Sequence, residues 1–450
     1  MIRIVAFVCA VVISACEPTP AIVPQENQAT LAALPAMKTF TAGRGRPTNK
    51  SNDQIAQDFL DLVFQTETGK PLTVLTRFEG PIRVSLSNNA SPLMRRDLAQ
   101  LLARLRAEAR VDIDLVRPGQ DAQIFVETVA RRELQTSRPE AACVFEANVS
   151  GWKELRRFRG SRSGQLERMT SRRTGTIIIP SDVGPQEMRD CLHEEIAQGL
   201  GPINDLFRLS DSVFNDNNIH VVLTGFDMLI LRAYYDPDLR NGMTKAQVAN
   251  ALPGVLARIN PRGQRGGRES ATPRRWNNAL SIAIAANTSN ERRYRSAELA
   301  LAEARTLGWT DHRLAYSLLV AAKQRLPRNA RSGRATFVEA QQLYDSLSGQ
   351  SVYAAHVAAQ MAAFALAEGS FSEAISISDR AIPATRSSEN AALLSTFLLL
   401  KAEALEASGR TQQARIVRND GLGWARYGYD SDRDVRSRQQ SIQALVPRGR

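Results

Sequence analysis

The spacing of apolar residues changes along the chain, and the first half contains the periods of both strands and helices. Residues 82–86 (Ile-Arg-Val-Ser-Leu) alternate apolar and polar positions as a half-buried strand does, whereas residues 92–109 place leucines at helical spacing. Ser51-Asn52-Asp53 can cap a helix that reaches Phe64, and residues 185–200 form another amphipathic helix. Further strands are predicted at 122–129, 142–149 and 176–179. We therefore expect a mixed α and β domain over residues 51–261.

The second half of the chain has helical spacing throughout and is rich in alanine and leucine. Leu366-Ala-Glu-Gly369 with Ala374, and then Ala404–Gly409 with Ala414, place small residues and a turn glycine about forty residues apart. This pattern resembles tetratricopeptide repeats, although the period exceeds their consensus of about 34 residues. The resemblance implies helix pairs that stack into a solenoid with a concave groove, while an unrelated helical bundle would use alanine similarly.

The chain begins with the features of an exported protein. A short basic start precedes an apolar run over residues 4–13, which is too short to span a bilayer, and Ser14-Ala15-Cys16 follow. The end of this segment resembles a bacterial lipobox, in which Cys16 becomes the acylated first residue. An ordinary signal peptide with an incidental cysteine is the alternative. Because Glu17 rather than aspartate follows, we expect a lipid-anchored protein at the outer membrane, facing the periplasm.

These patterns predict six segments. They are a lipoprotein signal peptide (1–16), a proline-containing tether (17–50), an α/β domain (51–261), a basic linker (262–275), tetratricopeptide-like repeats (276–425) and a basic flexible tail (426–450).

Two cysteines remain for the folded protein if Cys9 leaves with the signal peptide and Cys16 is acylated. Cys143 and Cys191 would then lie in an oxidising compartment, which favours a disulfide between them. Two buried free thiols are the alternative. The disulfide would close a loop of nearly fifty residues, so it would stabilise the fold by a few kcal/mol.

The candidate chemistry is concentrated in residues 191–205, Cys-Leu-His-Glu-Glu-Ile-Ala-Gln-Gly-Leu-Gly-Pro-Ile-Asn-Asp. Their spacing is that of the zinc-protease helix H-E-x-x-H-x-x-G-x-x-H, with the metal-binding letters changed. The corresponding motif positions are Glu194, Glu195, Gln198, Gly201 and Asn204, followed by Asp205. Gly201 is expected to end the helix in the left-handed conformation, before Pro202.

A zinc site of this kind requires imidazole ligands, but the ligand positions here hold Glu194, Gln198 and Asn204. His193 is one residue out of frame, and its i+4 neighbour is Ala197. We therefore expect no cofactor, and polar side chains that hold the loop 201–205 against the helix. The alternatives are an unusual zinc site that includes Glu194 or His193, and calcium at the acidic and amide groups of 204–205 and 215–218.

Four further segments share a resemblance with the motif helix. They are Asp58-Phe59-Leu60 with residues 75–81 (Leu-Thr-Arg-Phe-Glu-Gly-Pro), Ser-x-Phe-Asn-Asp at 212–216, and Tyr-Asp-Pro-Asp-Leu-Arg-Asn-Gly-Met at 235–243. Together they resemble a family of bacterial secreted proteins known only as a domain of unknown function, over about residues 51–261. That family is similar to metzincin proteases. The resemblance implies a zincin-like fold, with Met243 at the position of the Met-turn methionine, but it implies no particular reaction.

The net charge of +12 adds one candidate surface. Lys and Arg are concentrated at 153–173, where the candidate anion-binding side chains are Arg156, Arg157, Arg159 and Arg162. They could bind anionic envelope polymers such as lipid A phosphate or peptidoglycan carboxylates, whereas a solvated hairpin is the alternative. The sequence has no recognisable nucleic-acid motif, and export argues against a nucleic-acid partner.

Two functions follow from these features. The first is a membrane-anchored lipoprotein with a non-catalytic zincin-like domain, whose helical repeats bind an envelope protein. The second is an envelope hydrolase resembling a metallopeptidase, with Glu195 as general base at an atypical metal site.

Overall fold

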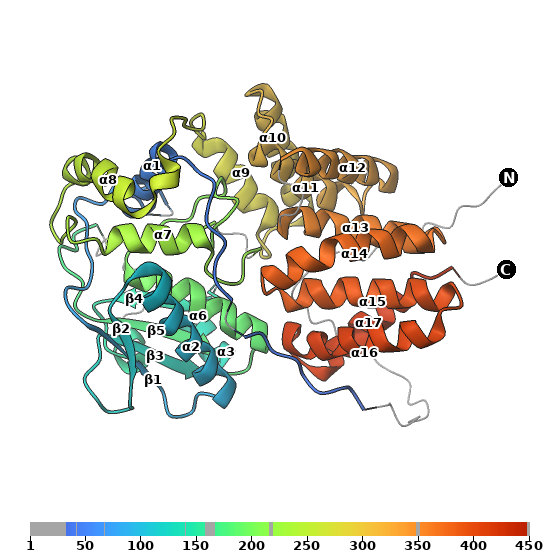
Figure 1. The fold of residues 1–450 in the computed structure, drawn as a ribbon, viewed down its shortest axis with the longest axis horizontal. Coiled ribbons are helices and arrows are strands. Elements are labelled where there is room, and N and C mark those ends of the chain that lie inside the picture. Colours follow the sequence, from blue (N-terminus) through green and yellow to red (C-terminus); the bar gives the residue numbers. More distant parts are fainter. Residues whose placement is uncertain are drawn as a thin grey trace. The chain divides into compact units, whose positions relative to one another are not determined.

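The computed structural model describes residues 33–447, except 42, 67, 140, 158–166, 216–218 and 348–351. The predicted signal peptide and Cys16 lie outside the described residues. The chain divides into an α/β unit, Phe40–Thr272, and a helical unit, which comprises Pro273–Arg450 and the residues up to Thr39 (Figure 1). The predicted order of an α/β region before an all-α region is therefore confirmed.

The α/β unit is built around a five-stranded sheet with the strand order β2-β1-β3-β5-β4. Strands β1, β2, β3 and β5 run parallel, and β4 pairs antiparallel with β5 at the edge. The strands are β1 (Ile82–Leu86), β2 (Ile113–Val116), β3 (Ile124–Val129), β4 (Val144–Ala147) and β5 (Gly175–Pro180). The expected strands are present, and β2 is an additional one.

Helices cover both faces of this sheet. The helices described in the unit are α1 (Asn52–Val63), α2 (Pro92–Arg104), the π-helix η1 (Leu105–Ala109), α3 (Arg131–Ser137), α4 (Trp152–Leu155), α6 (Pro185–Leu200), α7 (Gly225–Tyr234), α8 (Lys245–Ile259) and the short η2 (Pro261–Gly263). Of these, α2, α3, α4 and α6 contact the strands. Strand β5 is buried on both faces. Ile177 and Ile179 join the main core with α2 and α6, whereas Ile178 joins a smaller core with α3 and α4.

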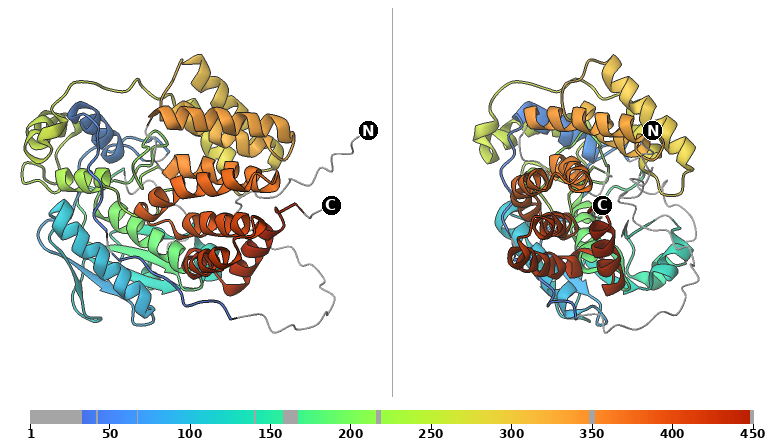
Figure 2. Two further views of the ribbon diagram at one scale, coloured as in Figure 1. Left: turned by 45° about the vertical axis from the view of Figure 1, so that its right-hand side comes forward. Right: turned by 90° about the vertical axis from the view of Figure 1, so that its right-hand side faces the viewer.

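The helical unit consists of consecutive helices that pack on their neighbours (Figure 2). They are α9 (Arg274–Ile284), α10 (Asn290–Thr306), α11 (His312–Arg325), α12 (Ala330–Leu347), α13 (Val352–Ala367), α14 (Phe371–Ser387), α15 (Ala391–Ala407), α16 (Thr411–Gly428) and α17 (Asp432–Gln443). The starts of α10, α12, α14 and α16 are about forty residues apart, as are those of α11, α13, α15 and α17. Among the helices in the described residues, none combines the length and apolar character needed to cross a bilayer.

One expectation about the ends of the folded region is wrong. The segment expected to be a flexible tail from 426 contains the end of α16 and all of α17, because Val435 and Ile442 on α17 are buried apolar side chains. Of the expected tether, residues 17–32 lie outside the described residues. Most of residues 33–50 are exposed, although Phe40 is buried and the backbone N–H of Gly45 donates to Glu108 at 3.0 Å.

Residues 33–39, called the N-terminal strap below, lie along α16 within the helical unit. The Lys38 N–H donates to the carbonyl of Gly423 at 3.0 Å, and Arg426 donates to the carbonyl of Pro35 at 3.0 Å. The Lys38 ammonium also forms an ion pair with Asp420. A Cβ at Gly423 would come within 3.1 Å of the Ala36 carbonyl, which is a tight contact, so this glycine lets the strap lie close to α16.

Candidate functional site

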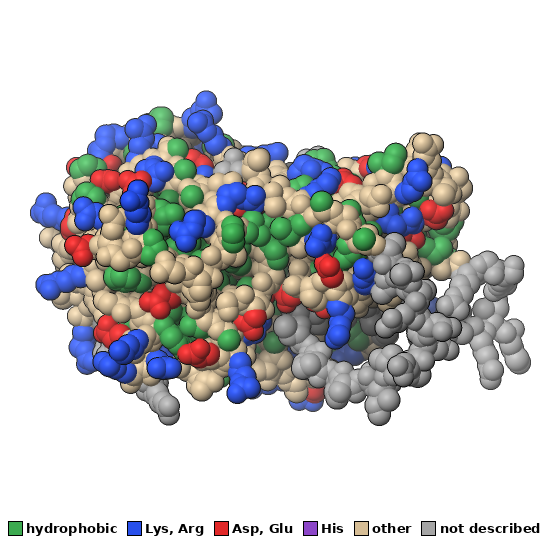
Figure 3. All heavy atoms as spheres, turned by 90° about the horizontal axis from the view of Figure 1, so that it is seen from below, with side chains coloured by type: hydrophobic (Ala, Val, Ile, Leu, Met, Phe, Trp, Pro, Cys, Tyr) green, Lys and Arg blue, Asp and Glu red, His purple; other side chains and the backbone are tan. Residues whose placement is uncertain are grey.

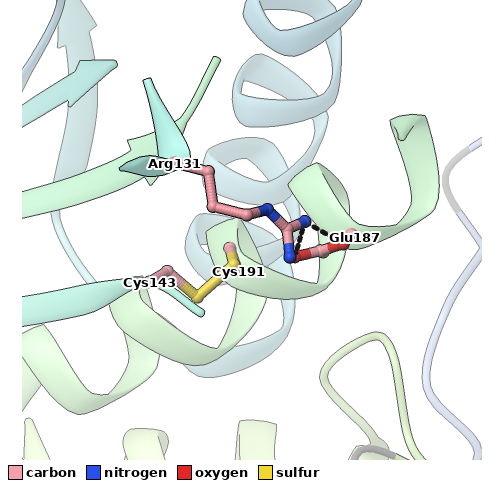
Figure 4. The surroundings of a disulfide bond; sticks show 4 residues. All are labelled: Arg131, Cys143, Glu187 and Cys191. Atoms are coloured by element: carbon pink, nitrogen blue, oxygen red, sulfur yellow. Dashed lines mark hydrogen bonds and ion pairs between the residues drawn. A yellow bond between two sulfur atoms is a disulfide. The ribbon is translucent and has the colours of Figure 1, made fainter. Parts of the chain in front are cut away.

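The motif helix is α6, which begins at Pro185 and directly follows β5 along the chain. The Cys143–Cys191 disulfide joins it to β4, with the two Cα atoms 5.9 Å apart, so the predicted disulfide is confirmed (Figure 4). Arg131 forms a bidentate ion pair with Glu187 in the first turn of α6, at 2.7 and 2.8 Å. The N-terminal half of the motif helix is thus fixed covalently and by charge.

The C-terminal end of α6 is closed by Arg172, a buried side chain from the segment before β5. Its guanidinium donates to the carbonyls of Gln198 (2.9 Å), Gly199 (2.6 Å) and Gly201 (3.2 Å). A cation at this end also interacts favourably with the helix dipole. Burial lowers the pKa of Arg172, and its guanidinium lies over the Phe145 ring. Sequence reasoning placed Arg172 in a surface cluster, because its helix partner is distant in sequence.

Gly201 ends α6, but its conformation is not the expected left-handed one. Its φ is 166°, which is extended backbone. The reason for glycine is space: a Cβ would lie 2.3 Å from the Tyr234 ring. The neighbouring Tyr235 hydroxyl donates to the Leu200 carbonyl at 2.8 Å, so the two tyrosines of α7 and its C-cap pack around the end of the motif helix.

His193 is committed to the backbone of another segment. Its Nδ1 accepts a hydrogen bond from the Leu223 N–H at 3.0 Å, which leaves the ring proton on Nε2. The side chain is buried. Burial lowers the pKa of His193 well below its usual range, and the charges of Arg189 and Arg104 lower it further. The imidazole is therefore a neutral structural group that positions the residues before α7.

The remaining motif positions connect α6 and its following loop to α1. Asn204 donates from Nδ2 to the Asp61 carbonyl at 2.8 Å, and the Ile203 N–H donates to the Leu62 carbonyl at 3.3 Å. Gln198 donates to Asp205 over 3.5 Å, a long hydrogen bond. The loop 201–205 is thus tied to α1, and the Gln198–Asp205 contact corresponds to the bonding expected within the motif.

A buried ionic network extends this connection, and sequence reasoning did not find it. Arg208 forms ion pairs with Asp58 and Asp61, each at 2.9 Å. Asp58 is fully buried and also binds Lys50 at 2.9 Å and Gln54 at 2.8 Å. Such partners offset the cost of burying these charged side chains. Asp58 belongs to a segment quoted for the family resemblance, which was the available signal.

The described part of the predicted segment 212–216 contacts Asp227, in the first turn of α7. The Ser212 hydroxyl donates to Asp227 at 2.5 Å, and the Val213 N–H donates at 3.1 Å. Thr224 and Asp227 also form a capping box at the start of α7. Burial raises the pKa of Asp227 to about 6, although these hydrogen bonds oppose the shift. Burial and the charge of Asp227 raise the pKa of Asp211 to about 7, against the effect of Lys50.

The segments 75–81 and 235–243 pair with one another. The Gly242 N–H donates to the Leu75 carbonyl at 3.0 Å, and the Leu75 N–H donates to the Met243 carbonyl at 2.9 Å. The Asn241 side chain bonds both backbone groups of Arg77. Met243 is thereby held beside Leu75, and it packs against the same core that contains α6.

The donor groups do not converge as a metal site would require. Within the described ranges, no three His, Cys, Asp or Glu side chains lie close enough together to hold a metal ion. Glu195 is buried, with 5% of its surface exposed, and Glu194 is half-buried. Burial raises the pKa of Asp190 well above its usual range, and the neighbouring charges of Glu194 and Glu187 raise it further.

The other predicted sites are only partly described. Arg156 and Arg157 are exposed, and Arg156 forms an ion pair with Glu133 at 3.5 Å, whereas Arg159 and Arg162 lie outside the described residues. On the face drawn in Figure 3, Lys and Arg side chains are interspersed with Asp and Glu. Of the expected calcium ligands, residues 216–218 also lie outside the described residues, and Asn215 donates to the Leu209 carbonyl at 2.5 Å.

Comparison with known proteins finds a family model that matches part of the α/β unit. No curated protein and no solved structure matches the chain significantly. Residues 52–254, which include every motif segment described above, match the model of a family described as "Protein of unknown function (DUF2927)". This match supports the resemblance of the α/β unit to a domain of unknown function.

Proposed function

We propose that the protein is a lipoprotein anchored through Cys16 to the outer membrane, facing the periplasm. In this proposal the α/β unit is a non-catalytic zincin-like domain. The helical unit is a tetratricopeptide-like scaffold that binds an envelope protein.

One observation carries the non-catalytic part of the proposal: the polar side chains of the motif are used as structural ties. His193 accepts from the Leu223 backbone, and Asn204 donates to the Asp61 backbone. A catalytic zinc site needs ligands that converge on one point and leave one position open. Side chains committed to different backbone segments are typical of a domain that keeps the shape of the site without its metal.

The zincin-like fold is supported by the order of elements. A strand, a helix, further strands and then a helix bearing the motif follow one another, as they do in zincins. The repeat assignment is supported by helix starts that recur about every forty residues. It is also supported by Gly369 and Gly409, which have φ values of 76° and 77° in the turns before α14 and α16. Arg156 and Arg157 remain candidates for contact with anionic envelope polymers.

The alternative is an envelope metallopeptidase with Glu195 as general base. Its supporting observation is the burial of the Glu195 carboxylate on the motif helix, because buried carboxylates at such positions often take part in acid–base chemistry.

Metal analysis separates the two functions. We would purify residues 17–450 without chelator and measure transition metals by mass spectrometry, alongside a Glu194→Ala, Gln198→Ala double variant. We expect neither protein to retain stoichiometric metal. Zinc that is present at one equivalent and lost in the double variant would overturn the non-catalytic proposal. Peptide hydrolysis that stops in Glu195→Gln would then identify the base.

A further inference from the structure

A cleft of about 550 Å³ lies between α1 and α8, two helices that pack side by side in the α/β unit (Figure 1). Its floor consists of small or apolar side chains: Ala56 and Leu60 from α1, and Ala249, Pro253 and Ala257 from α8. The three α8 residues are four positions apart and so share one helix face. The volume is within the range of small-ligand sites in proteins.

A loop at residues 263–268 closes one end of the cleft and is fixed to the start of α1. The Ser51 hydroxyl donates to the Gly267 carbonyl, and the Glu269 N–H donates to Gln54 at 2.6 Å. Arg265 donates to the Asn49 carbonyl. The cleft therefore has defined walls on both sides and at this end.

The charges that line the cleft favour an anionic ligand. Lys245, Arg265 and Arg268 contribute three exposed cations, whereas Asp53 and Asp61 contribute two anions. Asp61 is already paired with the buried Arg208 at 2.9 Å. Its charge is therefore largely neutralised, and the lining has an excess of positive charge.

The floor of the cleft favours an organic anion over an inorganic one. Ala56, Ala249, Pro253 and Ala257 present small or apolar surface beside the cations. A ligand with small apolar groups between its charges would cover this surface, and an inorganic anion would not.

We propose that the cleft binds a short acidic peptide. The peptide would place small side chains on the alanine floor and pair its carboxylates with Arg268 and Lys245. This inference goes beyond the proposed function, which assigns partner binding to the helical unit. It does not depend on the absence of metal at α6.

The test is fluorescence anisotropy of a fluorescein-labelled Ala-Glu-Ala-Glu-Ala peptide titrated with the full-length protein. Ala-Gln-Ala-Gln-Ala and Ala-Lys-Ala-Lys-Ala serve as neutral and basic counterparts. We expect the acidic peptide to bind more tightly than either counterpart, and Arg268→Glu to weaken its binding by about tenfold or more. Arg262→Glu is the matched control, because Arg262 is exposed in the neighbouring turn but does not line the cleft.

A second pair of variants tests the location by filling space. Ala249→Trp would fill the cleft and should abolish binding. Gly254→Trp, on an exposed α8 position with no atom within 4 Å of an added Cβ, should leave it unchanged. Far-ultraviolet circular dichroism would verify that both variants fold. Equal binding by Arg268→Glu and Arg262→Glu, no binding by the wild type, or displacement of the peptide by an equal concentration of acetate would each overturn the proposal.

Discussion

Asp211 and Asp227 are two carboxyl groups whose environment disfavours their charged form. Both lie around the start of α7, where burial raises their pKa values to about 7 and about 6. The hydrogen bonds from Ser212, Val213 and Thr224 stabilise the Asp227 carboxylate but do not fully offset its burial. These residues therefore link the stability of the α/β unit to pH.

The sign of this dependence follows from proton binding. In the unfolded chain both groups lose their protons near pH 4, whereas the folded protein holds them up to about pH 6 to 7. The folded state thus binds more protons between these values, and the contribution of this pair to stability falls as pH rises through that window.

We expect Asp211→Asn to reduce this fall and to stabilise the α/β unit at pH 8, because the variant carries no charge to desolvate. Urea denaturation between pH 4 and 8, monitored by hydrogen exchange in α7, would measure how the free energy of unfolding changes with pH. The exposed Asp112→Asn controls for the loss of one negative charge. An unchanged pH slope in Asp211→Asn would contradict the assignment.

At this scale the sequence allowed some predictions and not others. Structural roles for Asn204 and Gln198 were predicted because amides are weak metal ligands, and their side chains donate to the Asp61 carbonyl and to Asp205. The need for glycine at 201 could not be derived correctly, because it depends on the ring of Tyr234 in another helix. The role of Arg172 was also hidden, since its three acceptors lie more than twenty residues away in sequence.

Among the elements, α6 shows how one helix is fixed at both ends. The disulfide and the Arg131–Glu187 pair hold its first half, and Arg172 satisfies carbonyls at its other end. The cysteines could be paired from the sequence because only two remain once Cys9 and Cys16 are assigned to the predicted signal segment. The cap that Arg172 forms at the C-terminal end of α6 could not be predicted from the sequence.

Removing the Arg172 cap should weaken the motif helix specifically. Arg172→Met keeps a long apolar stem near Phe145 but leaves buried carbonyls without donors, which we expect to cost about 2 to 3 kcal/mol. Hydrogen–deuterium exchange of residues 185–200 would measure the loss as faster exchange. Arg173→Met is the control, because its side chain is exposed on the adjacent position. Similar exchange in both variants would show that the cap contributes little.

The elements themselves were predictable where their apolar pattern was long. The strands at 82–86 and 176–179 and the helix at 185–200 agree closely with the structure. Strand β2 was missed because four residues, Ile113–Val116, give too short a pattern. Helix α17 was missed because it buries only Val435 and Ile442 within a polar sequence.

The remaining prediction concerns the whole molecule and follows from the predicted export signal. We expect the chain expressed in a bacterial host to incorporate a radiolabelled or clickable fatty acid at Cys16, and Cys16→Ser to lose both the label and its retention in the membrane fraction. Cys9→Ser is the matched control, because it removes a cysteine from the same segment without touching the acylation site. Label that persists in Cys16→Ser would disprove anchoring at this residue.

The division into two units was visible in the sequence as a change of composition near 262–275, and the contacts place it at Thr272. What composition could not show is that the N-terminal residues belong with the C-terminal helices. The strap joins α16 through Lys38 and Pro35, although almost 400 residues separate them.

The N-terminal strap would limit how far the helical unit can lie from the membrane. If Cys16 carries lipid, only residues 17–32 separate the bilayer from the strap. Their end-to-end length is at most about 55 Å when fully extended. The helical unit would then remain within that distance of the membrane surface. Partners embedded in the same bilayer would meet it at an effective concentration on the order of millimolar, so even weak binding would suffice.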